Sequence, residues 1–296
     1  MRKWFAMPLL AWGLVLSAGA EPVQLEYQGL RLNANLEAVD GNWPTGPVVL
    51  MTHGTLAHGG MEIMRGLQNM FRDRGLSSLA ITLSLGLDNR AGMYDCALPH
   101  THKHTDALGE IGAWLDWLKS QGAERVALLG HSRGGNQTAR FAATHKESAI
   151  VAVFLIAPMT WDAAGAAADY EARYKVDPAG VQQRAQALVD AGQGSAMLEG
   201  IGFVYCEDTQ ATADAFLSYH GNDPELDTPQ LLPAIPYPVT VFAGSEDQVV
   251  EGLIEKTGTV ADGEKIQLQV IDGAEHFFRD LYSEEIADLV AEQLGM

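Results

Sequence analysis

A serine lies in a sequence context that could make it a nucleophile. Ser132 is the centre of Gly-His-Ser-Arg-Gly (130–134), which follows a short apolar run and precedes a helix-like segment, 136–145. So sharp a strand-to-helix turn crowds the backbone, and glycine two residues before and after the serine avoids a clash. Such a turn would lift the hydroxyl clear of the sheet and leave the backbone N–H of Arg133 free to bind an oxyanion.

Two residues further along the chain could activate this serine. One β-branched run ends in glycine and is followed by Asp247, and the next such run is followed by His276. A serine hydroxyl is a weak nucleophile unless a base accepts its proton, and a histidine oriented by a carboxylate can do so. We predict His276 as the base and Asp247 as the orienting acid. Glu246 and Asp272 are alternatives for the acid, and the position after the glycine favours Asp247.

The order serine, acid, histidine resembles that of the α/β-hydrolase superfamily, and the resemblance covers nearly the whole chain after the first twenty residues. The apolar run 47–52, followed by His53-Gly-Thr, is similar to the family's His-Gly oxyanion loop. The resemblance implies that the backbone N–H of Thr55, or of Leu56, is a second oxyanion donor. It also implies no metal or organic cofactor.

The resemblance further implies an α/β fold whose mostly parallel, eight-stranded sheet is flanked by helices. Strand and helix patterns do alternate along the chain, which favours a parallel sheet with right-handed crossovers. Apolar strand-like runs and helical patterns occur at 23–27, 31–39, 47–52, 61–74, 78–83, 106–120, 149–157, 237–243, 265–271 and 283–294.

The alternation stops between residues 159 and 236. Alanine-rich helical patterns at 163–174 and 178–191 are followed by a polar, proline-containing segment. By resemblance this region is a helical lid inserted into a core formed by 21–158 and 237–296. A surface decoration remote from the site is the alternative.

The first twenty residues have the composition of a secretory signal peptide. Two basic residues precede an apolar run that ends at Leu16, and Ala18 and Ala20 form an A-x-A cleavage site. We therefore predict a bacterial protein exported to the periplasm or the medium, with residues 1–20 removed and no stable membrane anchor. An uncleaved anchor is the alternative.

The chain is strongly acidic, with 38 acidic and 19 basic side chains. Loss of residues 1–20 removes two basic residues and no acid, so the formal net charge changes from −19 to −21. Such a charge repels nucleic acids and anionic membranes, so we predict neither as a partner. The sequence does not predict the oligomeric state.

One segment is dense in histidine. His100, His102 and His104 alternate and are followed by Asp106, so an extended chain would place three imidazoles on one side. This pattern could bind zinc. The start of a helix nearby disrupts the extended geometry, so we predict no metal site and consider His102 a candidate substrate-facing residue.

Further pocket candidates follow from position alone. His53 and Leu56 belong to the oxyanion loop and His131 precedes the nucleophile, although packing under the turn is the alternative for both histidines. The side chain of Arg133 could bind an acidic group of a substrate or pair with an acid of the lid.

The two cysteines, Cys96 and Cys206, lie in the histidine-rich segment and in the lid, respectively. In an oxidising compartment they could form a disulfide between lid and core, and two unpaired thiols are the alternative.

Together these features predict an exported serine hydrolase that cleaves a small-molecule carboxylic ester through an acyl-enzyme on Ser132. Amidase, peptidase and acyltransferase activities would use the same three residues. A non-catalytic binding protein that kept the fold is an alternative of another class.

Overall fold

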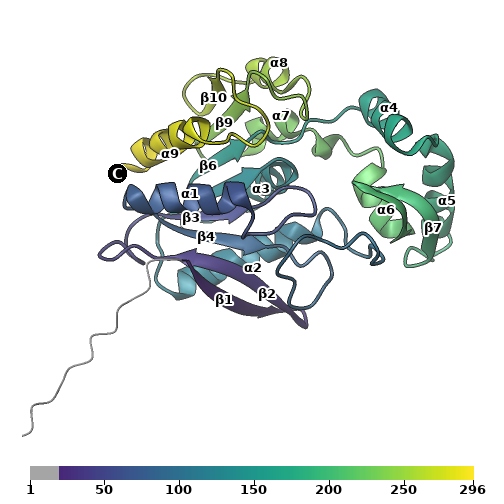
Figure 1. Ribbon diagram of the computed structural model, residues 1–296, viewed down its shortest axis with the longest axis horizontal. Helices are drawn as coiled ribbons and strands as arrows, with labels where there is room; N and C mark the ends of the chain where they lie inside the picture. The colour runs from purple at the N-terminus through teal and green to yellow at the C-terminus, as the bar shows by residue number, and fades with distance from the viewer. Residues whose placement is uncertain (1–19) are drawn as a thin grey trace, which may run out of the picture.

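The computed structural model describes residues 20–296, so the predicted signal peptide lies outside the described residues except for its last residue. Its centre is an eight-stranded sheet with the order β1-β2-β4-β3-β5-β6-β9-β10 (Figure 1). The strands are β1 (Glu21–Tyr27), β2 (Leu30–Glu37), β3 (Val48–Thr52), β4 (Ser77–Thr82), β5 (Val126–His131), β6 (Ile150–Ile156), β9 (Val239–Gly244) and β10 (Ile266–Ile271).

The sheet is mostly parallel, as the sequence predicted. Strand β2 pairs antiparallel with β1 and with β4, and all the other neighbouring strands run parallel. Every residue of β3 and β5 is buried. Such continuous burial is expected for central strands with helices on both faces, and it explains why these strands read as unbroken apolar runs.

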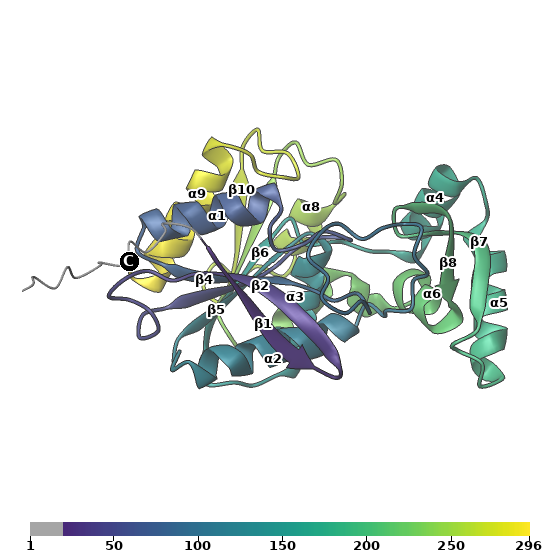
Figure 2. The ribbon, with the colours of Figure 1, turned by 60° about the horizontal axis from the view of Figure 1, so that its bottom comes forward.

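The helices of the core cover both faces of the sheet. Helices α1 (Glu62–Asp73) and α9 (Leu281–Leu294) lie on one face, whereas α2 (Asp106–Ser120) and α3 (Arg133–Thr144) lie on the other (Figure 2). A further helix, α8 (Leu253–Gly258), follows β9. Helix α1 buries Leu67 and Phe71, and Gly75 follows it with φ +78°, a conformation suited to ending a helix. No helix within residues 20–296 has the length and apolar character needed to cross a membrane.

Most of the region predicted as a lid lies beside the core (Figures 1 and 2), whereas its helix α7 (Thr228–Leu231) packs against α3 of the core. The two predicted helices, α4 (Ala163–Tyr174) and α5 (Pro178–Asp190), are present. The lid is not purely helical, however, because β7 (Met197–Phe203) and β8 (Cys206–Thr212) form an antiparallel hairpin. The remaining lid elements are α6 (Ala213–His220), η1 (Pro224–Leu226), α7 (Thr228–Leu231) and η2 (Leu232–Ala234).

The lid hairpin is attached to the loop that follows β4. Cys96 of that loop and Cys206 of β8 form a disulfide. Beside it the His100 N–H donates to the Gln210 carbonyl at 2.7 Å, and the Thr212 N–H donates to the His100 carbonyl at 2.9 Å. One covalent bond and a short run of backbone hydrogen bonds therefore fasten the β7–β8 hairpin to the loop after β4.

The disulfide is expected to contribute measurably to stability. It joins residues 110 positions apart, and a cross-link over so long a loop stabilises by about 5 kcal/mol in the chain-entropy treatment. The double variant Cys96→Ala/Cys206→Ala should therefore unfold at a clearly lower urea concentration than the parent, and reductant should shift only the parent. Equal midpoints for parent and variant would contradict this expectation.

Candidate active site

Ser132 lies on the turn between β5 and α3. Its φ of 57° and ψ of −124° form a combination rare for residues with a Cβ, with a cost of about 1–3 kcal/mol. Two glycines make the turn possible. A Cβ on Gly130 would lie 2.5 Å from the Gly134 carbonyl oxygen, and a Cβ on Gly134 would collide with the His53 carbonyl oxygen. The Ser132 N–H donates to the Ile156 carbonyl at 2.9 Å, which ties the turn to β6.

The three residues predicted to act together are in contact. His276 Nε2 lies 3.0 Å from Ser132 Oγ, and His276 Nδ1 lies 2.8 Å from Asp247 Oδ2. Asp247 follows β9 and His276 follows β10, so parallel strands deliver all three side chains to the same edge of the sheet. The geometry is that of a nucleophile, a base and an orienting acid.

Asp247, rather than either alternative acid, contacts the histidine. Burial by itself would raise the pKa of Asp247, but hydrogen bonds from the histidine and from the Val249 N–H hold that pKa below its ordinary value. The carboxylate is therefore ionised at neutral pH. Glu246 is exposed, and Asp272 instead accepts a hydrogen bond from Ser245 Oγ at 3.2 Å.

The loop after β3 passes beside the nucleophile. A Cβ on Gly54 would lie 3.3 Å from Ser132 Cβ, so the loop backbone and the serine are close neighbours. Within residues 20–296, the backbone N–H groups of Thr55 and Arg133 donate to no protein acceptor. Leu56 has φ +54°, so the loop turns sharply directly after Thr55. Two backbone donors are thus available to a ligand at this turn.

His53 holds this loop in place. Its Nδ1 lies 2.8 Å from the Gly54 carbonyl oxygen, and its Nε2 faces both the Leu83 N–H at 3.1 Å and Arg90 Nη2 at 3.2 Å. Because Nε2 faces two donors, the proton belongs on Nδ1, which donates to Gly54. Burial lowers the pKa of His53 to about 3, so the ring is neutral.

The loop after β4 is held by a second buried contact, which the sequence did not reveal. Glu110 on α2 accepts hydrogen bonds from the Ser84 N–H at 2.7 Å and from Ser84 Oγ at 2.5 Å. Burial raises the pKa of Glu110 to about 7. Arg90 also donates to the Leu83 carbonyl at 2.7 Å. Glu110 and Arg90 therefore hold neighbouring residues of the same loop.

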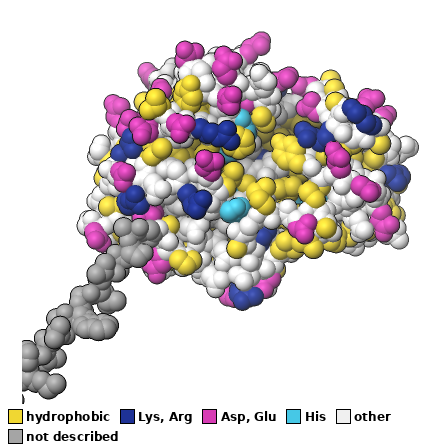
Figure 3. Space-filling model, viewed as in Figure 1, with side chains coloured by type: hydrophobic (Ala, Val, Ile, Leu, Met, Phe, Trp, Pro, Cys, Tyr) yellow, Lys and Arg dark blue, Asp and Glu magenta, His cyan; other side chains and the backbone are white. Residues whose placement is uncertain are grey.

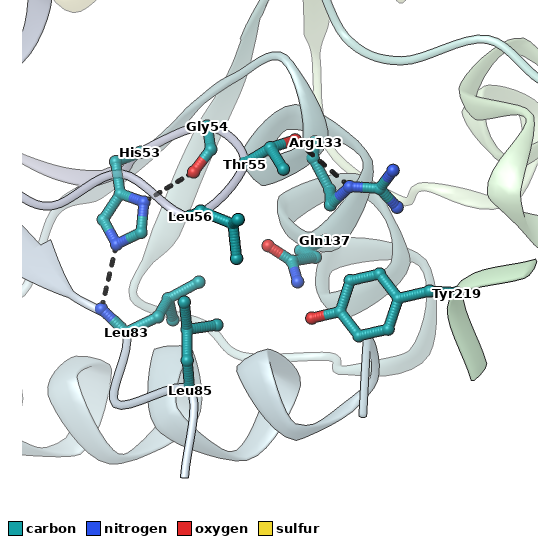
Figure 4. Close-up of a pocket in the computed structure, with 9 residues that line it drawn as sticks. All are labelled: His53, Gly54, Thr55, Leu56, Leu83, Leu85, Arg133, Gln137 and Tyr219. Carbon is teal, nitrogen blue, oxygen red and sulfur yellow. Dashed lines mark hydrogen bonds between the residues drawn. The ribbon is translucent and has the colours of Figure 1, made fainter. Parts of the chain in front are cut away.

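A small cavity lies beside the loop that follows β3 (Figure 4). Its volume of about 10 Å³ gives room for about one water molecule. His53 and Leu56, both predicted pocket residues, line it, whereas His102 and His131 do not. The lining residues are His53, Gly54, Thr55, Leu56, Leu83, Leu85, Arg133, Gln137 and Tyr219.

His131 packs under the turn. Its Nε2 donates to the backbone carbonyl of His276 at 3.0 Å, and its ring lies 4.9 Å from the His276 ring, centre to centre. Burial, the largest cause, lowers the pKa of His131 to about 4. The contact supports the loop that carries His276, and the His131 side chain is buried.

The three alternating histidines are buried between the core and the lid. His102 Nδ1 lies 2.8 Å from the Tyr219 hydroxyl, and His100 Nδ1 lies 3.3 Å from His102 Nε2. Burial lowers the pKa of His100 to about 4 and that of His102 to about 3. Across residues 20–296, no three or more His, Cys, Asp or Glu side chains are grouped so as to hold a metal ion. His104 is buried as well, and the rings pack against the aromatic residues Tyr94, Phe203 and Tyr219.

Apolar side chains border the three contacting residues. Phe277 and Val249 are 41% and 52% exposed, and the Phe277 ring lies 5.3 Å from the His276 ring. Figure 3 shows hydrophobic side chains gathered along the hollow between the core and the lid. Exposed apolar groups beside a nucleophile are suited to contact the apolar part of a substrate.

Comparisons with known proteins agree with this fold. Est1E from Butyrivibrio proteoclasticus has a TM-score of 0.63 and 19% identity, over 94% of this chain and 100% of that one. A monoacylglycerol lipase from Paleococcus ferrophilus has a TM-score of 0.60 and 18% identity, over 89% of this chain and 98% of the lipase. The α/β-hydrolase GrgF from Penicillium sp. sh18 has a TM-score of 0.66 and 15% identity, over 93% of this chain and 97% of GrgF.

A search of curated proteins found no match. The model of the Alpha/beta hydrolase family matches residues 48–291, which is most of the chain and includes the loop after β3, the turn at Ser132, and both Asp247 and His276. This chain is a member of the α/β-hydrolase family.

Proposed function

We propose that this hydrolase cleaves carboxylic esters through an acyl-enzyme on Ser132. The observation that carries the proposal is the continuous contact from Ser132 Oγ to His276 Nε2 at 3.0 Å and from His276 Nδ1 to Asp247 Oδ2 at 2.8 Å. The hydroxyl is aligned with a base, and the base is aligned with an acid whose charge is retained at neutral pH.

In the proposed reaction, Ser132 Oγ attacks the ester carbonyl carbon while His276 Nε2 accepts the hydroxyl proton. The N–H groups of Thr55 and Arg133 donate to the resulting oxyanion, and each such donor typically contributes about 3 kcal/mol. His276 then passes the proton to the leaving alcohol. Water, deprotonated by His276, then attacks the acyl carbon; the bond to Ser132 Oγ breaks, and His276 returns the proton to that oxygen as the acid is released. Asp247 accepts the hydrogen bond from Nδ1–H throughout.

A small-molecule substrate is supported by two observations. Phe277 and Val249 offer exposed apolar surface next to the reacting groups. One of the similar structures is Est1E with ferulic acid bound, and another is a monoacylglycerol lipase. Both names concern small acyl compounds, which is the substrate class that we propose for this chain.

We also propose that the protein acts outside the cytoplasm. The leader-like residues 1–20 predict export. The Cys96–Cys206 disulfide supports this location, because structural disulfides persist mainly in oxidising compartments.

The first test is hydrolysis of p-nitrophenyl esters from acetyl to long acyl chains by the parent protein and by Ser132→Ala. We expect turnover by the parent and a loss on the order of 10⁴-fold or more in the variant, because the covalent step is removed. The preferred chain length would show how much apolar substrate the site accepts. Turnover that survives in Ser132→Ala would contradict the proposal. No ester turnover, with cleavage of p-nitroanilides, would favour the amidase alternative.

The second test concerns the acid. Asp247→Asn should lower kcat by about 10³–10⁴-fold, because an amide no longer favours the correct histidine tautomer or stabilises its charged form. Glu246→Gln and Asp272→Asn are matched controls, since neither side chain contacts His276, and both should remain close to the parent. A large loss in either control, with activity kept in Asp247→Asn, would assign the acid elsewhere.

A further inference from the structure

Arg133 carries a positive charge for which residues 20–296 supply no counterion. The side chain is partly buried, and its Nε donates to Thr55 Oγ1 at 3.2 Å. The guanidinium carbon lies 5.1 Å from the centre of the Tyr219 ring, and Nη1 is buried without a hydrogen-bond partner. Within residues 20–296 no carboxylate oxygen lies within 4.0 Å of the Arg133 guanidinium nitrogens. Figure 4 shows the side chain beside Thr55 with its guanidinium on the side of Tyr219.

Two other arginines of the described residues are buried, and their guanidinium groups have carboxylate or carbonyl partners. Arg140, seven positions along the same helix, pairs with Asp223 at 2.9 Å and with Glu225 at 2.5 Å. Arg90 donates to the carbonyls of Leu83 and Gly92 at 2.7 and 2.6 Å. Among the arginines within residues 20–296, only Arg133 has a buried side-chain nitrogen without a hydrogen-bond partner, although acids outnumber bases by 38 to 19 in the full sequence.

The groups around Arg133 are polar but uncharged. His102 and His104 are buried, and burial, with a smaller contribution from the Arg133 charge, lowers the pKa of both imidazoles far enough to keep them neutral. Tyr219, a lid residue, is neutral because burial raises its pKa above the ordinary value. A charge that is removed from water and has no counterion is unfavourable. The position of the Arg133 guanidinium therefore favours binding of an anion.

We propose that the Arg133 side chain binds a carboxylate of the substrate, so that the preferred substrate is an ester carrying a carboxylate group near its scissile bond. This proposal rests on the proposed function, because it names the substrate class of the same site. Nε is held by Thr55, and the Tyr219 ring packs against the guanidinium, so the free N–H groups have a fixed direction.

A carboxylate fits this site better than a phosphate. One planar guanidinium can donate two parallel hydrogen bonds to one planar, singly charged carboxylate. A phosphate monoester would bring more charge than a single arginine among neutral neighbours can balance. The sequence left open whether Arg133 pairs with an acid of the lid, and the structure offers no such acid within 4.0 Å.

The test compares monomethyl esters of short dicarboxylic acids with neutral methyl esters of the same chain length, with rates followed by acid release. The measured quantity is the ratio of kcat/KM for the charged ester to kcat/KM for the neutral one. We expect a ratio above one for the parent and a ratio about 10- to 100-fold lower for Arg133→Gln, mainly through KM of the charged ester. Arg133→Lys should restore part of the preference. Because both esters are assayed on the same variant, damage to the shared machinery cancels in the ratio.

Arg279→Gln is the control for long-range attraction. Arg279 is exposed and its guanidinium carbon lies 5.6 Å from the centre of the Phe277 ring, so it is a positive charge near the site that lies outside the proposed contact. If Arg133 binds the carboxylate directly, this variant should keep the parent ratio. An equal fall in Arg279→Gln and Arg133→Gln, or an unchanged ratio in Arg133→Gln, would overturn the proposal.

A binding measurement separates this proposal from the proposed function. Calorimetric titration of the charged ester into Ser132→Ala and into Ser132→Ala/Arg133→Gln requires no turnover. Weaker binding to the double variant would support the carboxylate contact, even if the parent hydrolysed no ester and the proposed function failed. Equal binding to the two variants would overturn the carboxylate contact, while Ser132-dependent hydrolysis of neutral esters would leave the proposed function standing.

Discussion

Ser132 is held at φ 57° between β5 and α3, and the other parts of the site are arranged around that turn. The conformation is possible because Gly130 and Gly134 leave room for crossing backbone, and because a hydrogen bond to the Ile156 carbonyl ties the serine to β6. The same turn directs the hydroxyl toward His276 and frees the N–H of the following residue. A local backbone cost is thus balanced by the packing of the fully buried central strands β3 and β5.

The fold and the three contacting residues could be predicted because short sequence patterns determine them. The glycines at 130 and 134, the unbroken apolar strands and the order Ser132, Asp247, His276 each carry local information. The hairpin β7–β8 was missed because glycines, exposed polar residues and two register shifts hide the alternation typical of strands. Arg90 and Glu110 were missed because their roles arise only from burial and from partners distant in sequence.

Residues from the region predicted as a lid reach the surroundings of Arg133. The Cys96–Cys206 disulfide keeps the hairpin against the loop after β4, and Tyr219 from α6 reaches the Arg133 side chain. The buried Tyr219 phenol stays neutral and so does not cancel the arginine charge, and the buried His102 imidazole stays neutral and so adds no further positive charge. The chain has a net charge of −19, yet within residues 20–296 no carboxylate pairs with Arg133, the residue directly after Ser132.

Activation of Ser132 by His276 is tested most directly by covalent labelling with a fluorophosphonate. Peptide mass mapping then locates the labelled residue. Labelling requires an activated serine, because the phosphorus centre is attacked by the same oxygen that would attack an ester carbonyl. We predict a single adduct on Ser132 in the parent protein and a large loss of labelling rate in His276→Gln. An adduct elsewhere, no adduct, or labelling that is indifferent to His276→Gln would contradict the claim.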